Sequence, residues 1–415
     1  MHTAMQADAY KIIHHAVQAV LPGAAVKNAL QTIERKPSYV VAIGKAAWKM
    51  AAAAAEVLGD DLIEGIVITK YHHSEGPIRK MTIYEAGHPV PDANGLAATE
   101  QALRLADKLR AEDRMIFLVS GGGSALFEAL PDGVTLDDLM KLTKKLLSSG
   151  ASITEMNAIR KHISKVKGGR FALRCMPAKV INVILSDIIG DPLDAIASGP
   201  AYPDASTSED ASKIVRRYGV EITPEMEKSL AMETPKTLSN ITTCVTGNVQ
   251  LLCESAKEMA RGLGYMPVVL TATLDCEARE AGAFFAAIAR QIRAKGEPFA
   301  TPCAVIAGGE TVVHLKGSGK GGRNQELALA AAKGMDGLEN TLLFSFGSDG
   351  TDGPTDAAGG MVDGNFYAAC AEKGLSVEDT LENNDAYHLL KEMGGLIVSG
   401  PTGTNVNDLT VLLVR

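Results

Sequence analysis

Short apolar runs that stop at glycine or charged residues recur along the first part of the chain, and this pattern limits the fold more than any other feature. Four such runs cover residues 38–43, 65–69, 115–119 and 180–185. Continuous apolar runs of this length are typical of strands buried on both faces, and the segments between them are long enough for crossover helices. The repetition predicts an α/β fold with a parallel sheet covered by helices on both faces.

A second α/β region is predicted beyond a polar stretch at residues 233–243. Strand candidates there are residues 243–245, 266–270, 303–307, 311–315, 342–346 and 409–414, with alanine-rich helices at 277–295 and 324–333 between them. The two runs that flank Gly308 and Gly309 indicate a hairpin, so this sheet should be mixed. Because 415 residues exceed one ordinary core, we expect two domains, 1–236 and 237–415.

Composition excludes several classes of protein. A hydrophobic fraction of 46% and a charged fraction of 22% are ordinary for globular chains, and a net charge of −8 argues against a nucleic-acid surface. No apolar run is long enough to cross a membrane, and the first residues lack the order of a signal peptide. The six cysteines show no metal-type spacing. We therefore expect a cytoplasmic protein whose partners are small molecules, with no nucleic acid and no membrane.

Loops that follow the strands of a parallel sheet face its ligand crevice, and the loop after residues 115–119 is rich in glycine. It reads Ser120-Gly121-Gly122-Gly123-Ser124. Successive glycines let backbone N–H groups turn inward around an anion, although they also serve plain turn geometry. Lys45 ends the first strand, where an ammonium reaches a phosphate or a carboxylate. We predict anion binding by these residues together.

Two further groups in the first region carry charge. Asn157, Arg160 and Lys161 share one face of a predicted helix, which is either a solvated face or an anion site; the negative balance of the chain favours the anion site. Asp187 and Asp191 follow the strand at 180–185. Aspartates in such a place bind Mg²⁺, or simply form turns.

The second region repeats these signals. Gly321, Gly322, Arg323 and Asn324 open a helix, where a basic group opposes the helix dipole unless a polyanion is bound. Asp349 and Asp352 lie in a glycine-rich acidic loop that lacks the other ligands of an EF-hand, so they are further Mg²⁺ candidates.

In these motifs the chain resembles the type II glycerate kinases, also called glycerate 2-kinases and sometimes named hydroxypyruvate reductases. The shared motifs span nearly the whole chain, at residues 44–46, 87–92, 120–126, 157–161, 167–169, 186–187, 198–200, 308–311, 321–326, 348–356 and 402–408. The resemblance implies a Rossmann-like, doubly wound N-terminal domain, a smaller mixed-sheet C-terminal domain and an active site in the interdomain cleft. It also implies ATP and Mg²⁺ as cofactors, D-glycerate as substrate, phosphorylation at the 2-hydroxyl, and Lys45 and Arg323 as catalytic cations facing each other across the cleft.

Two other functions compete with the kinase. An NAD(P)H-dependent hydroxypyruvate reductase requires the fingerprint G-x-G-x-x-G after a strand, and the first glycine loop reads Gly-Gly-Gly-Ser instead. A non-catalytic hydroxy-acid binding protein would bind the ligand without turnover. The kinase is the stronger prediction, and a homodimer is one assembly that it allows.

Overall fold

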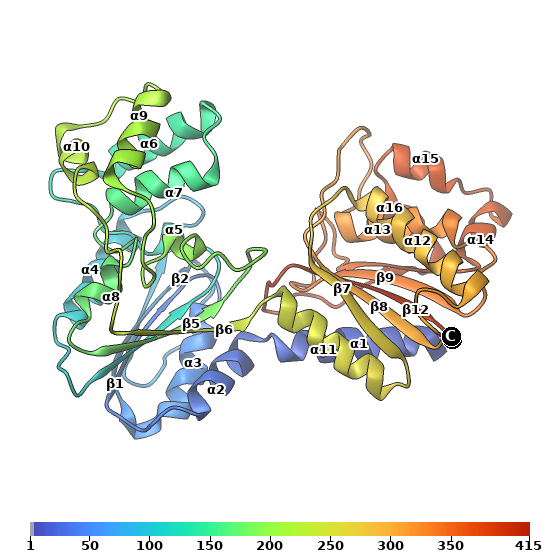
Figure 1. The fold of residues 1–415 in the computed structure, drawn as a ribbon, viewed down its shortest axis with the longest axis horizontal. Helices are drawn as coiled ribbons and strands as arrows, with labels where there is room; N and C mark the ends of the chain where they lie inside the picture. The colour runs from blue at the N-terminus through green and yellow to red at the C-terminus, as the bar shows by residue number, and fades with distance from the viewer. Residues whose placement is uncertain (1–3) are drawn as a thin grey trace. The chain divides into compact units, whose positions relative to one another are not determined.

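The computed structural model describes residues 4–415, which form two compact units (Figure 1). The parallel unit comprises Pro22–Ser186 and Asp191–Thr246, and the mixed unit comprises residues 4–21, Asp187–Gly190 and Gly247–Arg415. These bounds differ from 1–236 and 237–415 because helix α1 (Ala4–Ala19) packs against α11 (Val249–Gly262) inside the mixed unit.

The parallel unit is built on a six-stranded sheet in the order β3-β2-β1-β4-β5-β6. Its strands are β1 (Ser38–Ile43), β2 (Leu62–Lys70), β3 (Met81–Ala86), β4 (Arg114–Val119), β5 (Lys179–Leu185) and β6 (Ile241–Gly247). The pairs β1–β2, β1–β4, β2–β3 and β4–β5 are parallel, as the apolar runs predict. The strand order reverses between β1 and β4, which is where open α/β sheets bind ligands. Residues 243–245 belong to β6 and so to this sheet, not to the second region as predicted.

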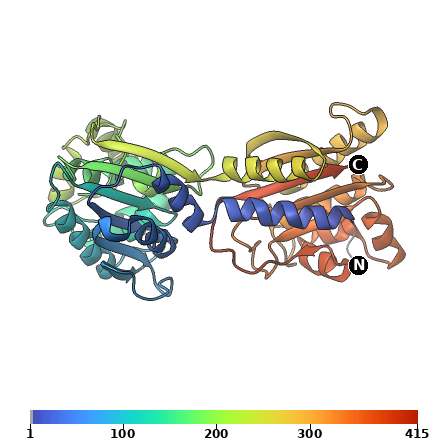
Figure 2. The ribbon, with the colours of Figure 1, turned by 90° about the horizontal axis from the view of Figure 1, so that it is seen from below.

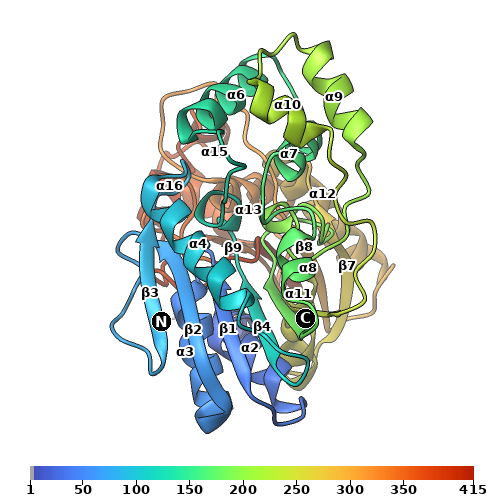
Figure 3. The same cartoon turned by 90° about the vertical axis from the view of Figure 1, so that its left-hand side faces the viewer.

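Helices cover both faces of this sheet (Figure 3). One face carries α2 (Pro22–Gln31) and α3 (Ala47–Leu58), and the other carries α4 (Ala93–Ala106) and α8 (Arg170–Arg174). A helical subdomain with its own apolar core stands beside them, made of α6 (Leu136–Ser148), α7 (Ile153–His162), α9 (Ser208–Arg217) and α10 (Pro224–Leu230). Each of α6, α7 and α9 begins at a capping box, which satisfies its first N–H groups.

The mixed unit has a six-stranded sheet in the order β11-β10-β9-β12-β8-β7. Its strands are β7 (Met266–Leu274), β8 (Cys303–Gly309), β9 (Thr341–Gly347), β10 (Gly359–Asp363), β11 (Leu396–Ile397) and β12 (Asp408–Val414). The last strand, β12, runs antiparallel between β8 and β9 and pairs Asp408 with both Gly309 and Gly347. The loops after β8 and β9 therefore meet the loop before β12 at one edge.

The predicted hairpin around Gly308 and Gly309 is wrong. Residues 310–322 form a loop after β8, in which Val312 makes one isolated bridge to Glu277. The sheet is nevertheless mixed, as predicted, because β12 and β10 run antiparallel to their neighbours.

Helices α1 and α11 lie side by side on one face of the mixed sheet (Figure 2). The other face carries α12 (Ala278–Lys295) and α13 (Arg323–Gly334), with α14 (Phe366–Glu372), α15 (Val377–Glu382) and α16 (Ala386–Met393) near them. Among the described residues, no helix is long and apolar enough to span a membrane.

Candidate active site

The loops after β1 and β4 are hydrogen-bonded to each other at the point where the strand order of the parallel sheet reverses. The backbone N–H of Lys45 donates to the carbonyl oxygen of Gly121 at 2.9 Å. The Ser120 hydroxyl accepts from the N–H of Ala46 at 3.1 Å and lies 3.2 Å from the carbonyl oxygen of Ile43. The predicted residues Lys45, Ser120 and Gly121 are thus brought together, and Ser120 joins the two loops.

The ammonium of Lys45 has no hydrogen bond or ion pair with any other residue between 4 and 415. Its stem lies over the glycine turn: a Cβ atom on Gly122, where φ is +88°, would lie 3.3 Å from Lys45 Cγ and 2.9 Å from the His88 ring. Gly123 opens the short helix α5 (Gly123–Leu126). An unpartnered cation beside a glycine turn is suited to hold an anion.

Ser124 and Asn157 are linked through Ser198. The Ser124 and Ser198 hydroxyl oxygens are 2.9 Å apart, and the Ser198 hydroxyl donates to Asn157 Oδ1 at 3.1 Å. Ser198 and Ala197 have φ values of +60° and +52°, which non-glycine residues rarely adopt. Such backbone strain often accompanies functional sites.

Arg160 and Lys161 differ in what they contact, although both lie in α7. The Lys161 ammonium is buried and pairs with Asp194 at 3.0 Å and Asp204 at 3.3 Å. The Arg160 guanidinium has no direct partner among the described residues, and burial lowers its pKa while the charge of Glu128 opposes this effect. Of the two predicted anion-binding cations, Arg160 is therefore the one whose charge is not already neutralised.

In the mixed unit, Arg323 begins α13 and is held by two carboxylates. Its Nε donates to Asp408 at 2.6 Å, its Nη2 donates to the other Asp408 oxygen at 3.1 Å, and its Nη1 donates to Glu310 at 2.8 Å. Burial lowers the pKa of Arg323, but the bonds and charge of Asp408 outweigh it and raise the pKa above its ordinary value. Since a guanidinium has five N–H groups and three are used, two remain for a ligand.

Asp352 caps α13 instead of standing free for a metal. Its two carboxylate oxygens accept from the backbone N–H groups of Asn324 at 3.1 Å and Gln325 at 2.9 Å. Burial raises the pKa of Asp352, and these bonds partly offset the rise. Asn324 is itself buried, and the Ser345 hydroxyl donates to its side chain at 2.6 Å. The negative charge that a polyanion was expected to bring to this helix start is supplied by the chain itself.

A cavity of about 800 Å³ lies beside this helix start, wholly within the mixed unit. Its lining residues are Ile189, Asp275, Glu310, Thr311, Val312, Val313, Leu315, Gly319, Gly321, Gly322, Arg323, Glu326, Asp349, Thr351, Asp352, Gly353, Pro354 and Asn384. Three of the four predicted residues at the helix start, Gly321, Gly322 and Arg323, therefore face one cavity.

The other predicted metal ligands do not form a preformed cluster. Asp349 uses one oxygen to accept from the N–H of Thr351 at 2.8 Å. Asp187 and Asp191 belong to different compact units. Across residues 4–415, no group of three or more potential ligands could hold a metal ion.

Two family models match the chain: a domain of unknown function (DUF4147) over residues 8–231 and the MOFRL family over residues 303–408. The chain is 53% identical to the D-glycerate 2-kinase of Thermotoga maritima, over 98% of this chain and 97% of that protein. The chain belongs to the glycerate 2-kinase family. A crystal structure of glycerate kinase from Thermotoga maritima has a TM-score of 0.97 and 52% identity, covering 99% of this chain and 100% of that one.

A more distant member of the glycerate 2-kinase family, the glycerate 2-kinase of Pyrococcus horikoshii, is 41% identical over 97% of this chain and 96% of that protein. A relative from Agrobacterium vitis, 38% identical over 97% of this chain and 93% of its own length, is named a putative hydroxypyruvate reductase. Both names that the sequence resemblance carries are thus found among the relatives.

The first glycine loop lacks the reductase fingerprint, but Gly317, Gly319 and Gly322 of the mixed unit have the G-x-G-x-x-G spacing. Their backbone surroundings do not suit a dinucleotide. The N–H groups of residues 316–320 donate to Asn383, Asn384 and Asp385, so this loop has few N–H groups left to bind a pyrophosphate. In this member of the glycerate 2-kinase family, Gly317 and Gly319 allow a close approach to residues 383–385, and Gly322 allows a close approach to Asp352.

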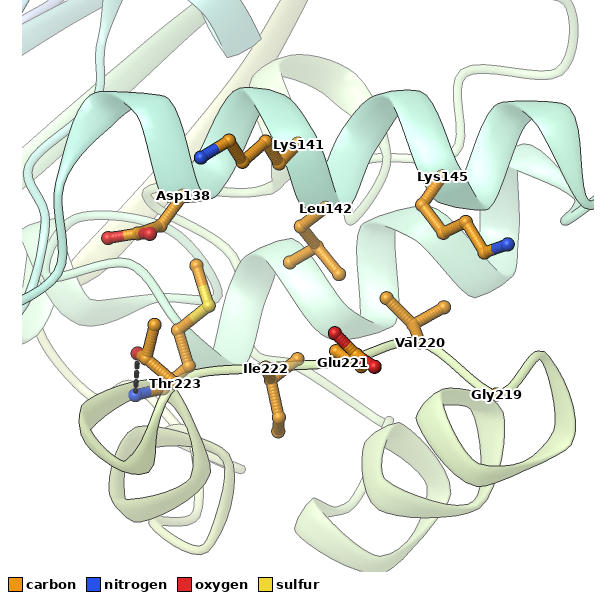
Figure 4. A pocket seen from close by; sticks show the side chains of 10 residues that line it. Asp138, Lys141, Leu142, Lys145, Gly219, Val220, Glu221, Ile222 and Thr223 are labelled. Atoms are coloured by element: carbon orange, nitrogen blue, oxygen red, sulfur yellow. Dashed lines mark hydrogen bonds between the residues drawn. The ribbon is translucent and has the colours of Figure 1, made fainter.

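A second depression, of about 580 Å³, lies between α6 and residues 219–226 in the helical subdomain (Figure 4). Lys141 and Lys145 extend along α6 at its rim, and Lys141 pairs with Asp137 at 2.6 Å. None of the predicted site residues lines it.

Sequence reasoning missed the partners that hold these residues. Asp408 and Glu310 orient Arg323, and Ser198 joins Ser124 to Asn157. Asp408 and Ser198 lie in the motifs at 402–408 and 198–200. The residues that they contact could not be predicted, because the strand order brings together loops that are far apart in sequence. An acidic residue directly before the apolar run 409–414 is the sequence signal that could have found Asp408, because an acid at such a place is buried only with a partner.

Proposed function

We propose that this chain transfers the terminal phosphoryl group of ATP to D-glycerate and forms 2-phosphoglycerate. The identity of 53% to a D-glycerate 2-kinase, over nearly the full length of both chains, is the observation that carries the proposal. In the reaction the glycerate hydroxyl oxygen forms a bond to the terminal phosphorus, and the bond from that phosphorus to the ADP oxygen breaks.

The parallel unit supplies an anion site around Lys45. The Lys45 ammonium binds a phosphate or the glycerate carboxylate, because it is an unpartnered cation at the strand-order reversal. Ser124 and Asn157 offer hydrogen bonds beside it, and Arg160 adds a second cation. Phosphoryl transfer needs little covalent help and depends on positioning and on charge placed near the transferring group.

The mixed unit supplies Arg323. Asp408 and Glu310 fix the plane of its guanidinium, so its two remaining N–H groups are oriented before a ligand arrives. A guanidinium of this kind binds two oxygens of a phosphoryl group.

Mg²⁺ bound together with ATP would shield the charge between its phosphates. Mg²⁺ in kinases is held by one or two carboxylates together with phosphates and water, so it needs no preformed cluster. Asp349 keeps one oxygen for this purpose, and Asp187 and Asp191 stay candidates. Asp352 fits poorly, because the N–H groups of α13 occupy both of its oxygens.

The test is a coupled assay with D-glycerate, ATP and Mg²⁺ that follows ADP, with the product identified by NMR. We expect 2-phosphoglycerate, and no activity in excess EDTA. Turnover of hydroxypyruvate with NADH and no ADP release would instead establish the reductase, and glycerate binding without either turnover would indicate a binding protein. We place the enzyme in the cytoplasm, and size-exclusion chromatography with light scattering tests the homodimer.

A further inference from the structure

The cavity of the mixed unit has an apolar wall whose side chains do not belong to the hydrophobic core. Val312 and Leu315 are large apolar residues of the loop after β8, yet they are 48% and 80% exposed. Ile189, Val313 and Pro354 line the same cavity. A volume of about 800 Å³ lies within the range of about 300–1,000 Å³ for small-molecule sites, and apolar walls are typical of them.

The charged residues of the lining are mostly acidic. Its carboxylates are Asp275, Glu310, Glu326, Asp349 and Asp352, and of the lining residues in the described part of the chain Arg323 alone is a cation. A phosphate chain placed deep among these carboxylates would be repelled. A neutral ligand with a flat apolar ring and several O–H or N–H donors would not.

Two of these carboxylates have oxygens left to accept from such a ligand. Glu310 binds Arg323, Glu326 binds Arg279 at 2.6 Å, and Asp352 caps α13. Asp275 makes no hydrogen bond to any residue in the described range 4–415, and Asp349 uses only one oxygen. The free carboxylate oxygens of Asp275 and Asp349 therefore line the same cavity as the apolar wall.

We propose that this cavity holds the nucleoside part of the phosphoryl donor. The base packs against Val312 and Leu315, and the sugar hydroxyls or the amino group of the base donate to Asp275. The phosphates leave the acidic part of the cavity and meet Arg323. This inference rests on the proposed kinase function, because it names where the donor of that reaction binds.

The experiment uses the full chain and two matched double variants. Val312→Ser with Leu315→Ser removes the apolar wall, and Met266→Ser with Phe284→Ser removes two other exposed apolar residues of the same unit, which are 55% and 61% exposed. Adenosine binding is measured by isothermal titration calorimetry, and KM is measured separately for ATP and for D-glycerate. We expect the wall variant to weaken adenosine binding and to raise KM for ATP, each by about tenfold, from the lost apolar contact.

The KM for D-glycerate should stay within about twofold in both double variants, and the control should bind adenosine like the unchanged chain. If the unchanged chain does not bind adenosine, the inference is overturned. The inference is also overturned if the wall variant and the control variant bind adenosine with equal affinity. A rise in KM for D-glycerate instead of ATP also overturns it, because the cavity would then serve the acceptor. Adenosine binding that responds to the wall variant in a chain without glycerate turnover supports the inference while the proposed function fails.

Discussion

The cation beside the glycine turn of the parallel unit is the Lys45 ammonium, which has no partner in the described chain. Lys45→Ala should therefore lower kcat by about 10²–10³-fold, the cost of losing one preorganised charge at a transferring group. Its melting temperature should stay within about 2 °C of the unchanged chain. The matched control is Lys49→Ala, which removes an exposed ammonium that pairs with Glu75 at 3.6 Å. Equal kinetic constants in Lys45→Ala and the unchanged chain would remove Lys45 from the mechanism.

Arg323 has both a structural and a proposed catalytic part, and two variants separate them. Arg323→Lys loses the planar fork that binds both oxygens of Asp408, so stability should fall and kcat should drop by about 10²–10³-fold. In Arg323→Lys the buried Asp408 carboxylate loses hydrogen bonds. The double variant Arg323→Lys with Asp408→Asn removes this charge, so its melting temperature should lie above that of Arg323→Lys alone. It should not restore kcat. If kcat recovers together with the melting temperature, the arginine acts only in folding; a rise in KM alone means that it binds substrate and transition state equally.

At the scale of the elements, the turn between β1 and α3 depends on Gly44. Its φ is +111°, and a Cβ atom there would collide with the hydroxyl and carbonyl oxygens of Ser120. Gly44→Ala should cost about 3 kcal/mol or more of unfolding free energy, measured by urea denaturation. Gly76→Ala is the control, because φ is +117° there but nothing lies within 4 Å. Equal losses in both variants would show that backbone strain, and not the contact with Ser120, explains the glycine.

The loop before β3 is tied to that strand by a carboxylate whose effect depends on pH. Glu85 accepts from the hydroxyl of Ser74 at 2.7 Å and from the N–H groups of Ser74 and His73 at 3.0 and 3.1 Å. Led by the Ser74 hydroxyl, these bonds lower the pKa of Glu85 from 4.5 to about 2. The stability they give is complete above pH 4.5 and is lost as the pH falls toward 2.

Glu85→Gln should therefore unfold more easily than the unchanged chain at pH 7, and the difference should shrink when urea unfolding is repeated at pH 4 and pH 3. Ser74→Ala removes the strongest donor and should flatten the same pH dependence. A difference that stays constant from pH 7 to pH 3 would exclude a titrating Glu85 as its cause.

At the scale of the whole molecule, the local apolar pattern predicted most strands, but it did not predict where each strand lies in its sheet. The runs at 38–43 and 409–414 are strands β1 and β12 because continuous apolar sequence marks burial on both faces. The run at 311–315 has the same appearance, yet Val312 and Leu315 are exposed at a cavity. The partners of Lys161 and Arg323 were equally unpredictable, because Asp204 and Asp408 approach them only after distant segments fold together.

The position of β12 gives the last prediction. This C-terminal strand is central in the mixed sheet, pairs along seven positions with β8 and along seven with β9, and is buried throughout. Deleting residues 408–415 would leave both neighbours with unpaired backbone groups inside the core, each of which costs free energy. We expect this deletion to abolish cooperative unfolding of the mixed unit by circular dichroism and calorimetry. Deleting Arg415 alone removes its side-chain bonds to Asp8 and Tyr265 and its backbone bonds to Asn340 and Arg293, but no strand pairing. It should lower the melting temperature by a few degrees, about 2–4 °C. A cooperative transition that survives the longer deletion would show that β8 and β9 close the sheet without the strand between them.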